Sequence, residues 1–197
     1  MSKAEAAEAR REQIVRAARE LYEERGIDRT SVTDIAARAG MTRSLFYHYF
    51  THKDEVTAAI LDGYVQGFVE AVRQWDEKRV RGDVAGALGS CVAMLRLHLF
   101  DRDSFRTDLR KSQNAQLYQR FSQQVASTLA TYFSSVVVPE YACYHHVEVR
   151  HPYEEFYLLI IGLMSYMRTH PEAPDELVAD LISDTLHLDL DPTNTAD

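Results

Sequence analysis

The sequence has few cysteines, and the two that it contains, Cys91 and Cys143, lie far apart in the chain. Small extracellular domains that lack a large core are held together by several disulfides, and two distant cysteines do not make such a framework. The pair suits a reducing compartment. We therefore expect a cytoplasmic protein in which both thiols are small core residues.

Long hydrophobic runs are also missing. No segment approaches the roughly eighteen uninterrupted apolar residues that a membrane-spanning helix needs. The first residues, MSKAEAAEARREQ, are charged and helical in character, with no apolar segment behind them, so they do not resemble a secretory signal. We therefore expect no membrane partner.

Strand-like alternation, a glycine-rich phosphate loop and internal repeats are absent as well. Hydrophobic residues make up 46% of the chain, which is ample for a core, and they recur at the spacing of an amphipathic helix. The pattern predicts an all-α protein, with Gly26 ending the first helix and Pro139 stopping a later one. The expected helices cover residues 4–25, 54–78, 84–100, 105–111, 115–138, 152–170 and 175–188, with two short ones between residues 31 and 53.

Residues 31–53, SVTDIAARAGMTRSLFYHYFTHK, predict two short helices joined by a tight turn. Ser31 and Asp34 have the spacing of a capping box at the start of the first helix. Gly40 lies where that helix must stop, at a position that favours a left-handed backbone, and Thr42 caps the second helix. This is the pattern of a helix-turn-helix, whose second helix enters the DNA major groove. The alternative is an ordinary buried helical hairpin.

The two faces of this motif differ in polarity. The residues spaced to pack its helices together are Ile35, Ala36, Ala39, Met41, Phe46 and Tyr49. The outer face collects Arg43, Ser44, Tyr47 and His48, the residue types that contact bases and phosphates.

The net charge of −8 is unusual for a nucleic-acid-binding protein until the chain is divided. Residues 1–55 contain ten basic and ten acidic residues, whereas residues 56–197 contain twelve basic and twenty acidic ones. All of the excess negative charge therefore lies outside the helix-turn-helix. Four basic side chains are expected around the DNA face: Arg29, Arg38, Arg43 and Lys53. The asymmetry permits DNA binding at one end and disfavours a second nucleic-acid surface.

The block GIDRTSVTDIAARAGMTRSLFYHYFTHKDEV, from Gly26 to Val56, resembles the TetR-type (TetR/AcrR) transcriptional regulators without a gap. The Ala-Gly turn, the tyrosine and phenylalanine of the second helix and the lysine after it fall in register. The match covers about the first sixty residues, and beyond them only the number and order of helices is similar.

The resemblance implies a helix-turn-helix DNA-binding domain over residues 1–52 and a helical effector-binding and dimerisation domain over residues 53–190. Residues 191–197 are expected to form a disordered tail. It also implies a homodimeric repressor, not an enzyme, that binds a near-palindromic operator in double-stranded DNA. A small-molecule effector would release such a repressor from its operator.

Individual DNA contacts are assigned on chemical grounds. Ser31 and Thr33, at the start of the helix before the turn, can contact a phosphate, and Thr42 does the same at the second helix. Arg43 can reach a guanine edge or a phosphate, and the sequence does not choose between them. Ser44 is a base-reading candidate that departs from the glycine frequent in the family.

The remaining contacts come from the resemblance or from position. Tyr47 and Lys53 match the phosphate-contacting tyrosine and lysine of the family. His48 is a further base-reading candidate. Leu45 either touches a thymine methyl or packs against the neighbouring helix.

An effector pocket needs an apolar cavity with a few polar groups, so aromatic or hydrophobic effectors fit best. The candidates for its lining are Trp75, Met94, His98, Phe105, Tyr118, Phe121, Tyr132, Phe156, Tyr157 and Met164. Residues at this spacing are also typical of a plain core, and His98 is interpreted as a hydrogen-bonded core histidine. An enzyme with His98 or the histidine-rich segment as general base is the alternative from another class, but no nucleophile and orienting residue accompany it.

The segment CYHHVEVRH, residues 143–151, contains side chains that could bind a metal: Cys143, His145, His146, Glu148 and His151. Adjacent histidines point in different directions in regular structure, and no second spaced pair accompanies them. We therefore predict neither a metal nor another cofactor. An exposed loop, or a lid over the pocket, is expected instead.

The last two predicted helices carry more apolar residues than packing on one side needs. Two such helices from each subunit would form a four-helix dimer interface, and its expected residues are Leu159, Leu163, Met167, Leu177, Leu181 and Leu186. The leading hypothesis is a ligand-responsive repressor. An effector-independent or activating regulator and a purely structural helical dimer are the alternatives.

Overall fold

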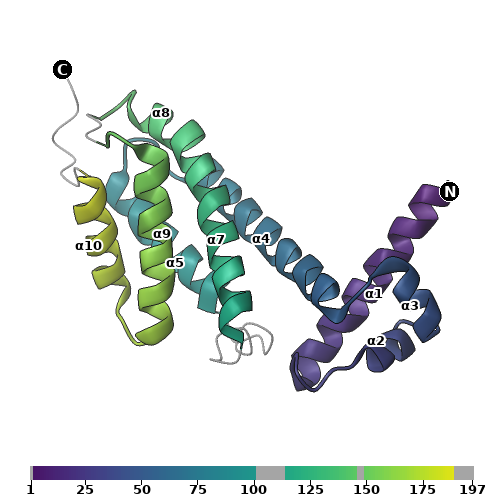
Figure 1. Ribbon diagram of the computed structural model, residues 1–197. Coiled ribbons are helices and arrows are strands. Elements are labelled where there is room, and N and C mark those ends of the chain that lie inside the picture. The colour runs from purple at the N-terminus through teal and green to yellow at the C-terminus, as the bar shows by residue number, and fades with distance from the viewer. Residues whose placement is uncertain (1, 101–113, 146–148, 189–197) are drawn as a thin grey trace. The chain divides into compact units, whose positions relative to one another are not determined.

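The computed structural model describes residues 2–100, 114–145 and 149–188, and it confirms the prediction of an all-α protein (Figure 1). No strand occurs in these three ranges. None of the helices that the structure describes is long and apolar enough to cross a membrane.

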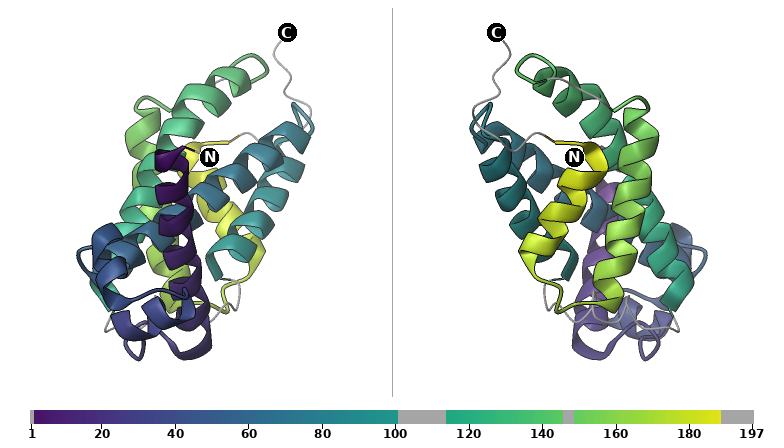
Figure 2. Two further views of the ribbon diagram at one scale, coloured as in Figure 1. Left: turned by 90° about the vertical axis from the view of Figure 1, so that its right-hand side faces the viewer. Right: turned by 90° about the vertical axis from the view of Figure 1, so that its left-hand side faces the viewer.

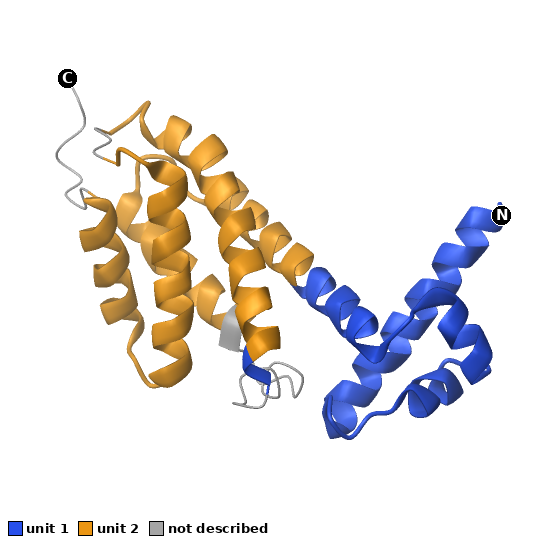
Figure 3. Ribbon diagram, in the orientation of Figure 1, with its two compact units in different colours: residues 1–64, 102–115 blue, residues 65–101, 116–197 orange. Residues whose placement is uncertain are grey.

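The chain divides into two compact units (Figure 3). Residues 2–64 make up most of the first unit, and the described part of the second comprises residues 65–100, 116–145 and 149–188. The predicted division at residues 52 and 53 stays a prediction. The predicted short helix at residues 105–111 and the predicted tail at residues 191–197 lie outside the described residues.

The first unit contains α1 (Lys3–Arg25), α2 (Val32–Arg38), α3 (Arg43–Tyr49) and the beginning of α4 (Lys53–Lys78). The capping box and glycine expected at the ends of these helices are present, as described below. Side chains with no exposed surface fill its centre: Ile14, Ala18, Tyr22, Ile35, Phe46 and Val56. The Tyr22 hydroxyl lies 3.0 Å from the Thr57 hydroxyl, which joins α1 to α4, and burial raises the pKa of Tyr22 to about 12.

The second unit contains the rest of α4 and the helices α5 (Val84–Phe100), α7 (Ala115–Tyr132), α9 (Pro152–Thr169) and α10 (Asp175–Leu186). Figure 2 shows α10 beside α5 and α9. These helices share one apolar core, formed by Leu88, Val92, Leu163, Met167, Val178, Ile182 and Leu186. Arg96 joins α5 to the start of α10, because its guanidinium pairs with Asp175 and donates to the Ala173 carbonyl at 2.5 Å.

Pro139 does not stop the helix that begins at Ala115, and this prediction was wrong. The chain widens into a π-helical segment, η2 (Phe133–Val137), and continues as the short α8 (Val138–Tyr141). A proline inside a regular α-helix lacks a hydrogen-bonding N–H and clashes with the carbonyl four residues earlier. Pro139 instead occupies the first turn of α8, where that N–H is not needed.

The two cysteines are both free thiols, but only one is a core residue. Cys91 is buried on α5, and burial raises its pKa to about 12. Cys143 is exposed just after α8, so the expectation that it packs in the core was wrong.

Candidate nucleic-acid interface and pocket

The turn between α2 and α3 is set by Gly40. Its φ of +64° is left-handed, as predicted from its position. The Gly40 amide donates to the Ala37 carbonyl at 3.1 Å and the Met41 amide to the Ala36 carbonyl at 2.9 Å. This pair of bonds is a Schellman motif, which satisfies the last carbonyls of α2 and reverses the chain toward α3.

Side-chain caps begin both helices at the predicted residues. The Ser31 hydroxyl accepts from the Asp34 amide at 3.2 Å, and the Asp34 carboxylate accepts from the Ser31 amide at 2.8 Å. The hydroxyl and amide of Ser31, with Arg25 3.1 Å away, hold the pKa of Asp34 at about 2. The Thr42 hydroxyl accepts from the Leu45 amide at 3.2 Å at the start of α3. Both helix starts are therefore fixed by local sequence.

Burial separates the two faces of α3. Phe46 is fully buried, with its ring against those of Tyr47 and Phe50. The predicted outer residues Arg43, Ser44, Tyr47 and His48 are all exposed. Because the inner face is held by the core, the outer face presents a fixed array of polar groups.

Arg43 and Tyr47 are in contact on this outer face. The Arg43 guanidinium donates to the Tyr47 hydroxyl at 3.2 Å, and its carbon lies 5.5 Å from the centre of the tyrosine ring. These contacts position the Arg43 guanidinium beside Tyr47, one turn further along α3. Leu45 is 38% exposed, which leaves its side chain accessible for an apolar contact.

Arg38 and Lys53, which were also expected at this face, already have intramolecular partners and are therefore less available for contacts with DNA. Arg38 pairs with Glu24 at 2.8 Å and with Glu20 at 3.3 Å on α1. The Lys53 ammonium donates to the carbonyls of Ile27 and Thr30 at 2.9 and 3.1 Å. In this structure Lys53 thus ties the start of α4 to the loop before α2.

Sequence reasoning missed one polar contact that positions the turn. The Gln13 side chain on α1 donates to the Ala39 carbonyl at 2.9 Å. Nothing in the helical spacing of α1 indicates this bond, because it joins residues that are distant in sequence.

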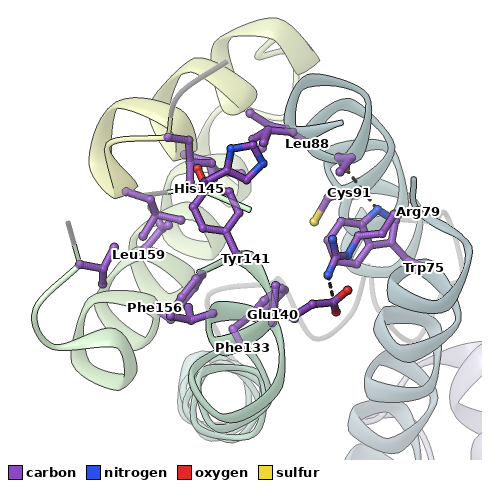
Figure 4. A pocket seen from close by; sticks show the side chains of 18 of the residues that line it. Trp75, Arg79, Leu88, Cys91, Phe133, Glu140, Tyr141, His145, Phe156 and Leu159 are labelled. Atoms are coloured by element: carbon purple, nitrogen blue, oxygen red, sulfur yellow. Dashed lines mark hydrogen bonds and ion pairs between the residues drawn. The ribbon is translucent and has the colours of Figure 1, made fainter. Parts of the chain in front are cut away.

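The second unit contains a pocket lined by residues of α4, α5, α7, η2, α8, α9 and α10 and by residues near the ends of these helices. Its cavity volume is about 160 Å³. Figure 4 shows Phe156 and Leu159 on one side of Tyr141 and His145, and Trp75 and Cys91 on the other. The π-helical segment contributes Phe133, whose ring stacks on that of Phe156 at 4.9 Å.

Charged groups in one part of the pocket wall are paired with each other. Arg79 lies 3.0 Å from the Glu140 carboxylate and 2.6 Å from that of Asp76, and its side chain is only 9% exposed. Arg81 lies 2.7 Å from Glu140. The Tyr132 hydroxyl donates to Asp76 at 2.7 Å. Arg79 and Glu140 line the pocket, and together with Asp76 and Arg81 they form a group of two cations and two anions whose charges balance.

The structure places the predicted pocket residues in different surroundings. Trp75 and Phe156 line the pocket. Tyr118, Phe121 and Met164 are buried and do not line the pocket. The Tyr118 hydroxyl donates to the Met164 carbonyl at 2.9 Å.

The other predicted lining residues lie outside the pocket wall. Met94, His98, Tyr132 and Tyr157 are partly buried and do not line this pocket. The His98 Nδ1 atom donates to the Met94 carbonyl at 3.0 Å, and the imidazole stacks on the Phe68 ring, as a core histidine would. Phe105 lies outside the described residues.

Sequence reasoning did not assign Arg79, Glu140 and Tyr141 to the pocket, and all three line it. They come from the end of α4 and from the region around α8. No periodic pattern joins them, because the π-helical segment changes the direction in which the residues after it face.

The segment after α8 forms part of the pocket. Tyr144, His145 and Val149 line it, whereas Cys143 and His151 are exposed, and the choice between a loop and a lid stays a prediction. Within the described chain no three potential metal ligands are grouped to hold an ion. His146 and Glu148 lie outside the described residues.

The residues predicted for the dimer interface fall into two groups. Leu163, Met167 and Leu186 belong to the core of the unit, and Leu159 packs against it. Leu177 and Leu181 are each 37% exposed, one turn apart on α10.

The geometry of the first unit defines a helix-turn-helix domain: two short capped helices, a Schellman turn and an exposed polar face on the second helix. Residues 14–60 match the family model of bacterial regulatory proteins, tetR family. Over these residues the chain is similar to the DNA-binding domain of TetR-type transcriptional regulators.

Relatives with established names match mainly over this domain. The chain is 34% identical over 97 residues to the transcriptional regulator TtgR of Pseudomonas putida. The aligned residues cover 49% of this chain and 44% of TtgR. It is 42% identical over 60 residues to the transcriptional repressor BepR of Brucella suis, covering 30% of the chain and 28% of BepR. The chain therefore aligns with less than half the length of these two relatives, a transcriptional regulator and a transcriptional repressor.

A solved structure shows the fold over nearly the whole chain. RolR in complex with resorcinol superposes with a TM-score of 0.63 at 16% identity, covering 95% of this chain and 92% of RolR. At this identity the likeness shows the fold alone.

Proposed function

We propose that the protein is a homodimeric transcriptional repressor that binds a near-palindromic operator and is released by a small hydrophobic or aromatic effector. The observation that carries the proposal is the outer face of α3, where Arg43, Ser44, Tyr47 and His48 are exposed above a fully buried Phe46. A recognition helix in the major groove needs this combination of a fixed back and a polar front.

Dimerisation would place two recognition helices on one side of the DNA. Half-sites about 34–36 Å apart correspond to one helical turn, so the operator should have matching two-fold symmetry. The apolar surface left exposed on α9 and α10 supports this assembly: Leu158 is 69% exposed, and Leu177 and Leu181 are 37% exposed.

The pocket in the second unit supports a role for an effector. An effector that binds one conformation of the dimer more tightly shifts the population toward it, and loss of DNA affinity follows if that conformation separates the recognition helices wrongly. A regulator whose DNA affinity does not respond to any ligand, or that activates transcription, is the alternative.

DNA binding is tested by fluorescence anisotropy with duplexes from the region upstream of the protein's own gene. We expect a palindromic site to bind more tightly than a scrambled duplex, with an affinity that falls as salt rises. Equal affinity for both duplexes at every salt concentration would end the repressor proposal.

Arg43→Ala should weaken operator binding by about 1–3 kcal/mol if the guanidinium reads a base edge. Specificity should relax at one position of each half-site, which a panel of single-base operator variants measures. Arg73→Ala, which removes an exposed arginine of the second unit, serves as the control. A uniform loss across the panel would instead assign Arg43 to a phosphate.

Leu181→Glu should raise the dissociation constant of the dimer by at least about tenfold, because a two-fold interface contains the new charge twice. Sedimentation equilibrium measures this constant. Val136→Glu is the control, since Val136 is 42% exposed on η2 and does not belong to the two helices proposed to form the interface. Dimers of equal strength in both variants would show that α10 does not form the interface.

A further inference from the structure

The size and lining of the pocket restrict what it can hold. An apolar cavity of about 150 Å³ accommodates a benzene-sized molecule, and this cavity measures about 160 Å³. Aromatic and aliphatic side chains form most of its wall, among them Trp75, Phe133, Phe156 and Leu163. One aromatic ring with small substituents therefore fits this cavity.

Among the residues that the structure describes, a histidine in the pocket wall has a buried nitrogen without a hydrogen-bond partner. The Nε2 atom of His145 is buried and makes no hydrogen bond to any residue that the structure describes. The imidazole stacks on the Tyr141 ring with centroids 4.6 Å apart, and Figure 4 shows both rings in the pocket. A buried nitrogen without a hydrogen bond is costly. A small turn of the imidazole within its stack would let a ligand supply the missing bond.

The charges of the wall decide the charge of that ligand. The cation in the wall, Arg79, is already paired with Asp76 and Glu140, and Arg81 also pairs with Glu140. A carboxylate ligand would enter a cavity whose described lining offers it no unpaired arginine and already contains two anions, Asp83 and Glu140. Burying such a charge without a partner is unfavourable, so a neutral polar group is favoured.

We propose that the pocket binds neutral single-ring phenols, with the phenolic hydroxyl hydrogen-bonded to His145 Nε2. A hydroxyl both donates and accepts, so it pairs with either tautomer of the imidazole. The aromatic ring lies among the apolar side chains of the wall. The regulatory meaning of this site rests on the proposed function, but phenol binding itself can be measured without DNA.

The fluorescence of Trp75 can be used to measure ligand binding to the pocket. Trp75 is the only tryptophan in the chain and it lines the pocket, so its fluorescence reports a ligand directly. The probes are 4-methylphenol, 1,4-dimethylbenzene and benzoate, titrated into the full-length protein. The first two have nearly the same shape and differ in a hydroxyl against a methyl group.

The wild-type protein should bind 4-methylphenol at least as tightly as 1,4-dimethylbenzene and should bind benzoate at least about tenfold more weakly. His145→Phe keeps a ring to stack on Tyr141 but removes the nitrogen. In this variant the ratio of the two dissociation constants should shift about tenfold in favour of 1,4-dimethylbenzene. His170→Phe is the matched control, because His170 also stacks on a tyrosine, Tyr166, but does not line the pocket.

A ratio that is the same in wild type and His145→Phe would overturn the assignment of the hydroxyl to His145. Benzoate binding as tight as that of 4-methylphenol would overturn the neutral ligand class. The proposed function fails separately: if 4-methylphenol binds as expected but leaves operator affinity unchanged, the phenol site stands and release by this effector does not. If other compounds release the DNA while no phenol binds, the phenol site is wrong and the repressor proposal stands.

Discussion

Phe46→Ala should lower the stability of the helix-turn-helix unit by about 3–5 kcal/mol, because it empties the space of a buried aromatic ring. Phe46 has no exposed surface and its ring contacts that of Phe50, with centroids 6.0 Å apart. The free energy of unfolding of such a small unit is low, so a loss of this size is a large fraction of it. The variant should therefore lose the ordered α3 and with it all operator binding.

Hydrogen exchange resolved along α2 and α3 measures the loss, and anisotropy measures DNA binding. Tyr47→Ala is the matched control, because Tyr47 is the next residue on α3 and is 45% exposed. We expect this control to keep its exchange protection while DNA binding weakens. Normal protection of α3 in Phe46→Ala would contradict the role of this ring as the centre of the motif.

Arg79→Met should destabilise the second unit by about 3–5 kcal/mol. The Arg79 side chain is 9% exposed, and its removal leaves the carboxylates of Asp76 and Glu140, which are 10% and 20% exposed, without their shared cation. Arg81 and Tyr132 still contact one carboxylate each, so we expect the lower part of this range. Urea denaturation followed by circular dichroism measures the change.

Two controls separate the buried charge from the loss of packing. Arg73→Met removes an exposed arginine of the same helix and should change stability little. The triple variant Asp76→Leu, Arg79→Met, Glu140→Met removes the whole charge group and should recover most of the loss, because no unpaired charge is left buried. A triple variant as unstable as the single one would show that shape, and not charge, makes Arg79 important.

The features predicted correctly from the sequence are local ones. The Ser31–Asp34 capping box, the Thr42 cap and the left-handed Gly40 each involve residues no more than five positions apart. Their chemistry determines the backbone without help from distant segments. The polar front of α3 follows from the same helical period that buries Phe46.

The features that were missed depend on distant contacts. From the sequence, Pro139 predicts the end of a helix. In the structure a π-helical segment precedes it and the chain continues as a helix beyond it. Distant contacts accompany this segment: Phe133 stacks on Phe156, and Glu140 pairs with Arg79. Leu163, Met167 and Leu186 have the spacing of an interface, yet they pack in the core of their own unit. Helical spacing marks an apolar face and does not say which neighbour covers it.

The sequence alone determined that this protein is helical, where its helix-turn-helix lies and which side chains that motif presents outward, because caps, turns and helical period are properties of neighbouring residues. The tertiary structure decided which apolar faces leave a cavity, that Arg38 and Lys53 are held by α1 and the following loop, and that His145 and the Arg79 ion pairs line the pocket. A cavity is a gap between side chains from segments far apart in the chain, so no local pattern can encode its outline.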